Sequence, residues 1–185
     1  MTGKILIINT CKEKLHYFEF VKPIEDIIKN INEKYITLHY FELTKKDLEK
    51  TDKIIICGTS LKDMEYLKYI DKFNFLKSIN KKVLGICSGM QIICLIFECK
   101  LVKGVEIGKT LVNFPENFLG LQEEKEVYSL HTLTIKEDKI LRKNFNIFSK
   151  SKYIQAIKHK QKEIYGVLFH PEVRQKALIL EFIKY

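Results

Sequence analysis

The fold of this chain is decided by the stretch Val83–Ile93, which reads VLGICSGMQII. An apolar run typical of a buried strand stops at Cys87, and an apolar segment of helical character follows at once. Gly85 and Gly89 flank the cysteine, and residues without a Cβ atom let the strand and the helix pack closely. The pattern predicts a nucleophile elbow, in which a helix N-terminus favours the thiolate form of the cysteine. A buried structural cysteine in a glycine-containing turn is the alternative.

A histidine and a glutamate near the other end of the chain supply what a catalytic cysteine needs. The run Ile164–Phe169 is typical of a buried strand, and it leads directly into His170-Pro171-Glu172. Residues two apart in an extended segment project to the same side, so Glu172 can orient the imidazole of His170. Such a base makes a cysteine nucleophilic at neutral pH. The sequence therefore predicts a triad of Cys87 with these two residues.

Length and composition agree with one ordinary globular unit. The 185 residues are enough for a full buried core, so we expect a single domain over residues 1–185. No stretch approaches the roughly 18 apolar residues of a membrane span, and the first apolar run, Lys4–Asn9, is too short for a signal peptide. The five cysteines form no C-x-x-C pair, and their odd number argues against a disulfide framework. We expect a reduced, cytoplasmic protein.

The net charge of +9 comes from lysines that are scattered along the chain rather than packed into one arm. This distribution is typical of a lysine-rich solvated surface. A nucleic-acid patch is a weaker interpretation, so we expect no nucleic-acid partner and no membrane partner. Docking onto an acidic partner protein is the functional interpretation that the charge favours.

Strands and helices alternate along the chain. We expect strands at Lys4–Asn9, Tyr35–Phe41, Lys53–Cys57 and Val83–Ile86, and others at Val127–Ile135, Asn146–Lys150 and Tyr153–Lys158 in a strand-rich second half. We expect helices at Pro23–Glu33, Leu61–Ile79, around Gln91–Phe97 and at Val173–Lys184. This alternation favours an α/β fold, a mostly parallel sheet with helices on both faces and the ligand site at the carboxyl ends of its strands.

Two motifs carry a resemblance to a known family. Gly85–Gln91, which reads GICSGMQ, and Phe169–Val173, which reads FHPEV, together strongly resemble the class I (triad) glutamine amidotransferase family. Gln155–Lys160 and Ile164–Val167 are similar to the lead-in strands of that family, especially in the archaeal-type glutaminase subunit of GMP synthase. The resemblance covers most of the chain. It implies a flavodoxin-like sheet with a small antiparallel region in the C-terminal half.

The resemblance implies that the substrate is L-glutamine and that the products are glutamate and ammonia. Cys87 attacks the carboxamide carbon of glutamine. His170, oriented by Glu172, protonates the departing ammonia and then activates the water that hydrolyses the γ-glutamyl thioester. No metal and no organic cofactor is implied.

The family's oxyanion hole corresponds to the loop after the expected strand Lys53–Cys57. One backbone donor comes from the residue after the nucleophile, Ser88, and the other from a Ser-Gly-Gly-Pro-like turn. Each donor is expected to stabilise the developing oxyanion by about 3 kcal/mol. This chain departs from that turn, since Thr59 replaces the second glycine and Ser60 the proline. A β-branched residue is strained at positive φ, so Gly58 is the more permissive donor.

Three further positions correspond to contacts with the substrate amino acid. Gln91 stands at the family's side-chain contact, and Thr132 and Leu133 stand where backbone amides meet the α-carboxylate. Their segment, residues 128–133, resembles the Tyr-His-Ser-Leu of anthranilate and aminodeoxychorismate synthase glutaminase subunits more than the Ser-His-Gly-Asp of GMP synthases. His131 is expected to be structural.

The sequence shows no glycine loop that would cradle the phosphates of ATP. Ammonia is therefore expected to pass to a separate ATP-dependent synthetase subunit, first of all that of GMP synthase, which converts XMP to GMP. The alternatives are a glutaminase subunit of anthranilate or aminodeoxychorismate synthase, a stand-alone γ-glutamyl hydrolase, and a non-catalytic regulatory homologue. Departures from the family at Thr59, Ser60 and Leu168 leave room for the last, and the intact Cys-His-Glu set argues against it.

Overall fold

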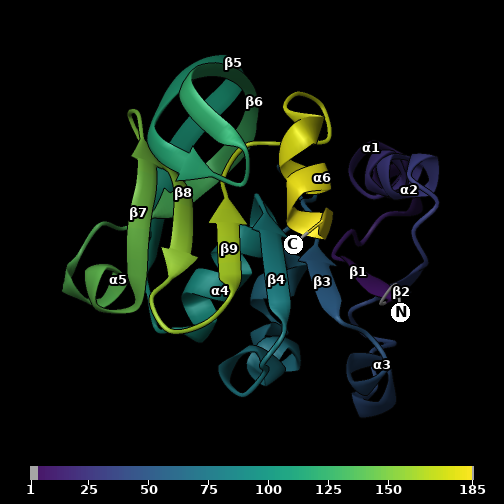
Figure 1. Ribbon diagram of the computed structural model, residues 1–185. Helices are drawn as coiled ribbons and strands as arrows, with labels where there is room; N and C mark the ends of the chain where they lie inside the picture. Colours follow the sequence, from purple (N-terminus) through teal and green to yellow (C-terminus); the bar gives the residue numbers. More distant parts are fainter. Residues whose placement is uncertain (1–3, 185) are drawn as a thin grey trace.

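The computed structural model describes residues 4–184 and contains a seven-stranded sheet with the strand order β2-β1-β3-β4-β9-β8-β7 (Figure 1). The parallel strands are β1 (Ile5–Asn9), β2 (Tyr35–His39), β3 (Lys53–Ile56), β4 (Lys82–Ile86) and β9 (Ile164–Val167). The antiparallel strands are β8 (Ile154–His159) and β7 (Phe145–Lys150). The predicted fold class, a mostly parallel α/β sheet with antiparallel strands in the C-terminal half, is confirmed.

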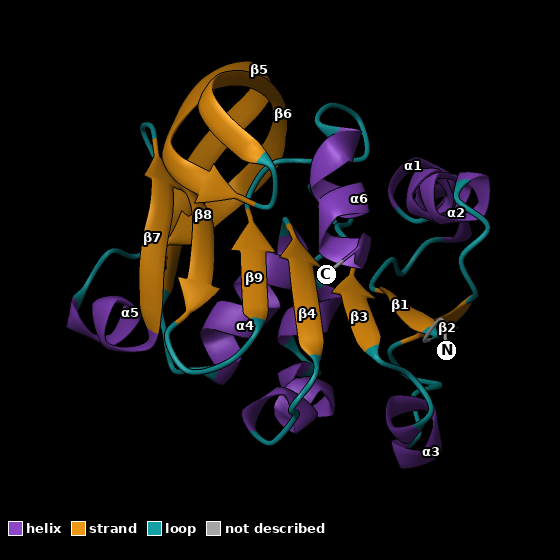
Figure 2. Cartoon of the chain, viewed as in Figure 1, coloured by secondary structure: helices purple, strands orange, loops and turns teal. Residues whose placement is uncertain are grey.

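Helices cover both faces of this sheet (Figure 2). One core contains α1 (Lys14–Phe20), α2 (Lys22–Asn30) and α6 (Lys176–Lys184). The other contains α4 (Ser88–Ile96) and the 3₁₀ helices η1 (Glu65–Leu67) and η2 (Ile70–Lys77). Successive strand residues enter opposite cores, which is why the central strands are apolar throughout. No helix within residues 4–184 is long and apolar enough to cross a membrane.

The second half of the chain contains a long hairpin, of which the sequence predicted only the strand Val127–Ile135. β5 (Leu101–Phe118) and β6 (Leu121–Ile135) form an antiparallel two-stranded sheet of their own, which arches above β7 and β8 in Figure 1. The Ser149 hydroxyl donates to the backbone oxygen of Asn113 at 2.5 Å and joins the hairpin to β7. The hairpin brings β6 over the carboxyl ends of the central strands.

The prediction of a single helix at Leu61–Ile79 is wrong, because the structure has the two 3₁₀ helices η1 and η2 there. The apolar residues Ile70, Phe73, Leu76 and Ile79 recur every three positions. The 3₁₀ helix η2, with three residues per turn, places the first three of these on one face, whereas an α-helix would rotate them apart. Phe73 and Leu76 are fully buried as a result.

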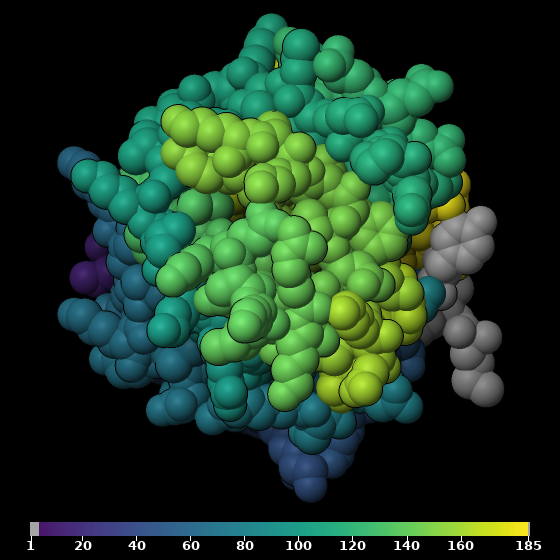
Figure 3. All heavy atoms as spheres, turned by 90° about the vertical axis from the view of Figure 1, so that its left-hand side faces the viewer, coloured from purple at the N-terminus to yellow at the C-terminus, as the bar shows by residue number. Residues whose placement is uncertain are grey.

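Other boundaries differ by a few residues. The last helix begins at Lys176 rather than at Val173, because Gln175 has a left-handed φ of 69° that no α-helix accommodates. The short helices α1, α3 (Lys45–Glu49) and α5 (Lys139–Asn144) were not predicted. Figure 3 shows the outer edge of the sheet, where the green residues around α5 and β7 occupy the middle of the molecular surface.

Candidate active site

Cys87 lies in a strained turn between β4 and α4. Its φ of 50° and ψ of −104° are rare for a residue with a side chain, as expected for a nucleophile elbow. Close packing explains both flanking glycines. A Cβ atom on Gly89 would lie 2.2 Å from the carbonyl oxygen of Ile56, and one on Gly85 would lie 2.6 Å from the Gly89 carbonyl group. The sequence pattern around Cys87 therefore produces the predicted turn.

His170 and Glu172 follow β9 and are both buried. His170 Nδ1 lies 2.7 Å from Glu172 Oε1. Burial disfavours the charged imidazole, but the charges of Glu172 and Cys87 outweigh it and raise the pKa of His170 well above its ordinary value. His170 Nε2 has no hydrogen-bond partner among residues 4–184. The imidazole is thus oriented through one nitrogen, and the other is left to exchange a proton.

The remaining predicted residues gather around a small cavity beside Cys87. Its lining includes every residue predicted for the oxyanion hole or for substrate contacts except Gly58. These residues are Thr59, Ser88, Gln91, Thr132 and Leu133. The cavity has a volume of about 20 Å³, which is room for about one water molecule. Cys87 Sγ donates to the backbone oxygen of Leu130 on β6 at 3.5 Å. The site is therefore narrow where β6 lies against Cys87, and glutamine needs it to widen.

Gly58 lies next to the side chains of Cys87 and His170. It does not line the cavity, and a Cβ atom on it would lie 2.7 Å from His170 Cε1 and 3.3 Å from Cys87 Cβ. Its missing side chain makes room for the imidazole. The strain expected at Thr59 is absent, because Thr59 is not among the described residues with positive φ. Its hydroxyl donates instead to Asp63 Oδ2 at 2.8 Å.

Gln91 is held by a residue that the sequence pattern did not reveal. The Tyr66 hydroxyl donates to Gln91 Oε1, and Gln91 Nε2 donates to the backbone oxygen of Leu133 at 2.9 Å. Tyr66 is buried on η1 and lines the same cavity. Its only sequence signal was a position within an expected α-helix, which gave no reason to place it near Gln91.

His131 on β6 lines the cavity but is occupied by other contacts. His131 Nδ1 lies 2.9 Å from the backbone oxygen of Gly104. Its Nε2 lies 3.6 Å from Glu106 Oε2, which also accepts from Gln155 Nε2 at 2.9 Å. Burial lowers the pKa of His131. A neutral imidazole joined to the hairpin backbone agrees with the structural role predicted for it.

Three of the other four cysteines lie in surroundings that suppress ionisation. Burial raises the pKa of Cys11 to about 12 and raises the pKa values of Cys57 and Cys94 well above the ordinary value. Thiolates are the nucleophilic form of cysteine. These three thiols are therefore poor nucleophiles, in contrast to a cysteine at a helix N-terminus beside an imidazole.

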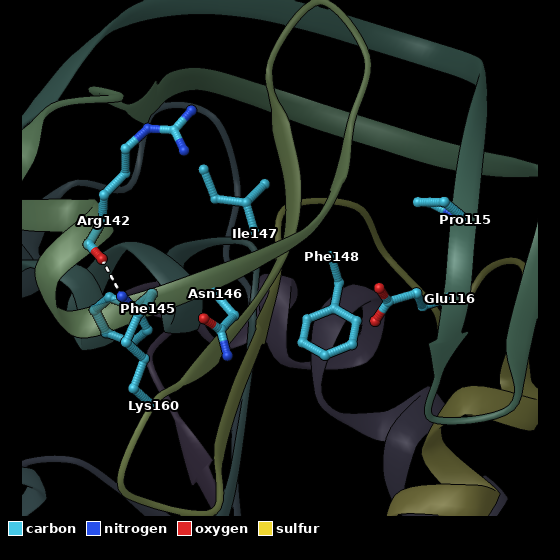
Figure 4. A pocket seen from close by; sticks show the side chains of 8 residues that line it. All are labelled: Pro115, Glu116, Arg142, Phe145, Asn146, Ile147, Phe148 and Lys160. Carbon is cyan, nitrogen blue, oxygen red and sulfur yellow. Dashed lines mark hydrogen bonds between the residues drawn. The ribbon is translucent and has the colours of Figure 1, made fainter.

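A larger hollow of about 450 Å³ lies elsewhere, between β7 and the tip of the hairpin (Figure 4). Within its lining, Lys160 Nζ donates to the backbone oxygen of Arg142 at 2.5 Å. Its lining comprises Pro115, Glu116, Arg142, Phe145, Asn146, Ile147, Phe148 and Lys160. None of these belongs to the Cys87 cluster, so the smaller cavity is the candidate active site on chemical grounds.

Comparison with known proteins identifies the family of this chain. Residues 15–184 match the family model described as glutamine amidotransferase class-I. The chain belongs to the class I glutamine amidotransferase family. It is 38% identical over 101 residues to a glutamine-hydrolyzing GMP synthase subunit of Pyrococcus abyssi, a match that covers 51% of this chain and 52% of that protein. The match thus spans about half the length of that relative.

Two further proteins extend the comparison over more of this amidotransferase chain. The corresponding glutamine-hydrolyzing GMP synthase subunit of Thermoplasma volcanium is 32% identical over 151 residues, which cover 77% of this chain and 73% of that protein. A crystal structure of a Thermoplasma acidophilum protein has a TM-score of 0.85 at 24% identity, and covers 100% of this chain and 94% of that one. The latter shows that the fold is shared across the whole chain.

Proposed function

We propose that this chain is a glutaminase that hydrolyses L-glutamine to glutamate and ammonia through Cys87, His170 and Glu172. The observation that carries the proposal is the convergence of a cysteine at positive φ with a buried His–Glu pair at the carboxyl edge of one sheet. A structural cysteine needs neither the strained turn nor the oriented base. Residues 1–185 act in this proposal as one glutaminase domain.

The geometry suggests the following sequence of events. The Cys87 thiolate attacks the carboxamide carbon, and the amides of Ser88 and Thr59 stabilise the oxyanion that forms. His170, oriented by Glu172, gives a proton to the departing ammonia and then takes one from the water that attacks the thioester. Gln91, held by Tyr66, and the β6 backbone at Thr132 and Leu133 receive the amino-acid end of glutamine.

A separate synthetase subunit consumes the ammonia in this proposal. The named relatives are glutamine-hydrolyzing subunits of GMP synthases, which supports an ATP-dependent subunit that converts XMP to GMP as the acceptor. The second candidate acceptor is the chorismate-using subunit of anthranilate or aminodeoxychorismate synthase, because residues 128–133 resemble the glutaminases of those enzymes.

The nucleophile is tested with the substitution Cys87→Ala. We expect glutaminase activity to fall to the detection limit while the circular dichroism spectrum and the unfolding midpoint stay close to those of the wild type. A glutamine-analogue electrophile should label Cys87 alone, because burial raises the pKa values of Cys11, Cys57 and Cys94, and because Cys99 is buried as well. Cys57→Ala is the matched control, and labelling of Cys57 or Cys94 would exclude the assignment.

A further inference from the structure

The loop that follows β3, residues 58–63, is held by a carboxylate that the family motif does not include. Asp63 is buried, and its Oδ2 accepts from the Thr59 hydroxyl at 2.8 Å and from the Lys12 backbone N–H at 2.5 Å. Its Oδ1 accepts from the backbone N–H of Glu65 at 3.4 Å. Hydrogen bonds to a charged acceptor are roughly twice as strong as those between neutral groups. Asp63 therefore joins this loop both to the segment after β1 and to the start of η1.

A second set of contacts fixes the direction of the peptide between Gly58 and Thr59. The Gly58 carbonyl oxygen lies 3.3 Å from the Thr10 hydroxyl and 3.7 Å from the Cys11 thiol, both of which follow β1. The Thr10 hydroxyl also lies 3.1 Å from the Cys57 carbonyl oxygen. In a planar trans peptide, the N–H of Thr59 points opposite to that carbonyl group. Since β3 lies between β1 and β4, the direction away from β1 is the direction of β4 and Cys87.

We propose that Asp63 is a positioning residue, which fixes the Thr59 amide as an oxyanion donor through the Thr59 side chain. The inference rests on the proposed glutaminase function. In the family pattern, a glycine and a proline occupy the positions of Thr59 and Ser60 and shape this turn. Here the Thr59 hydroxyl and the buried Asp63 carboxylate take over that task, so a threonine is accommodated without positive φ.

The proposal separates two kinds of reactivity at Cys87. Attack on glutamine develops an oxyanion, whereas alkylation by iodoacetamide is a substitution at a saturated carbon and develops none. A displacement of an oxyanion donor by about 1 Å can reduce the rate about 100-fold. Loss of the Asp63 contact should therefore slow glutamine hydrolysis and leave the alkylation of Cys87 unchanged.

Thr59→Val tests this directly, because valine keeps the shape and removes only the hydroxyl. We expect kcat to fall between about 10-fold and 100-fold, KM to change less than kcat, and the alkylation rate to match the wild type. Thr59→Ser, which keeps the hydroxyl, should retain most of the activity. A Thr59→Val enzyme as active as the wild type would overturn the proposal, as would an equal loss of hydrolysis and alkylation.

Amide hydrogen exchange gives a readout that does not depend on glutaminase activity. Asp63→Asn should accelerate exchange in residues 58–65 but not in β4 or α4, because the charge-assisted contacts of the loop are lost. Asp71→Asn is the matched control, since Asp71 is an exposed carboxylate on η2. Unchanged exchange in Asp63→Asn overturns the role of Asp63. If the wild type does not hydrolyse glutamine but exchange is accelerated in Asp63→Asn, the proposed glutaminase function is overturned, and the role of Asp63 in holding the loop is not.

Discussion

The pair of His170 and Glu172 shows how a single carboxylate sets the chemistry of its neighbour. Glu172→Gln keeps the size of the side chain but removes the charge that raises the pKa of His170. We expect kcat to fall by about 100-fold or more, because the imidazole loses its preferred tautomer. His170→Ala should abolish turnover as completely as Cys87→Ala does. Steady-state kinetics of the three variants check this, and an unaffected Glu172→Gln enzyme would show that another group orients His170.

The same pair predicts how stability depends on pH. A histidine whose pKa is raised on folding stabilises the folded state fully below its unfolded pKa, which is about 6.5. That contribution is lost as the pH rises through the folded pKa of His170. The stability difference between the wild type and Glu172→Gln should therefore be largest near pH 6 and should shrink in alkaline solution. Urea unfolding across this range measures it, and a constant difference would contradict the expected linkage.

Some residues of the site could be predicted from the sequence and others could not. Cys87, His170 and Glu172 were found because their chemistry requires particular residue types next to glycines or next to each other. Asp63 and Tyr66 were missed because their partners are defined only by the folded chain. The Tyr66–Gln91 contact joins residues 25 positions apart, and the hydrogen bonds of Thr10 join residues 47 and 48 apart.

At the scale of elements, glycines decide how closely β3, β4 and α4 approach. A Cβ atom at position 89 meets the backbone oxygen of Ile56, which cannot move without distorting β3. Gly89→Ala should therefore destabilise the fold by about 3 kcal/mol. A Cβ atom at position 58 meets the edge of the His170 ring instead. Gly58→Ala should therefore lose activity at a smaller cost in stability. Denaturant unfolding measures the stability of both variants, and glutaminase assays measure their activity. An equal loss of stability in the two variants would contradict this prediction.

Periodicity predicted the strands better than the helices. The apolar strands β1, β3, β4 and β9 were located within one or two residues, because buried parallel strands leave a continuous apolar run. Residues 61–79 were assigned to an α-helix although their apolar residues recur every three positions. The short helices α3 and α5 bury one face only partly, so their hydrophobic signal is weak.

At the scale of the whole molecule, the sequence predicted the sheet but not the arch of β5 and β6. The hairpin has a register shift between Lys103 and Glu106 that interrupts the alternation of apolar and polar residues. Its position matters for function, since β6 narrows the cavity beside Cys87. Access to the site therefore depends on an element that is far from the nucleophile in sequence.

The narrow cavity leads to a prediction about the partner. If the form that is wide enough for glutamine is a minor population, the apparent activity of the isolated chain falls in proportion to that population. We expect low glutamine hydrolysis by the purified chain and a marked increase when the synthetase subunit of a GMP synthase is added. Because the chain carries a net charge of +9, binding to an acidic subunit should weaken as salt is raised. Glutamate release, measured with and without each candidate subunit, is the test. Full activity of the isolated chain would favour a stand-alone hydrolase, and activation only by a chorismate-using subunit would reassign the acceptor.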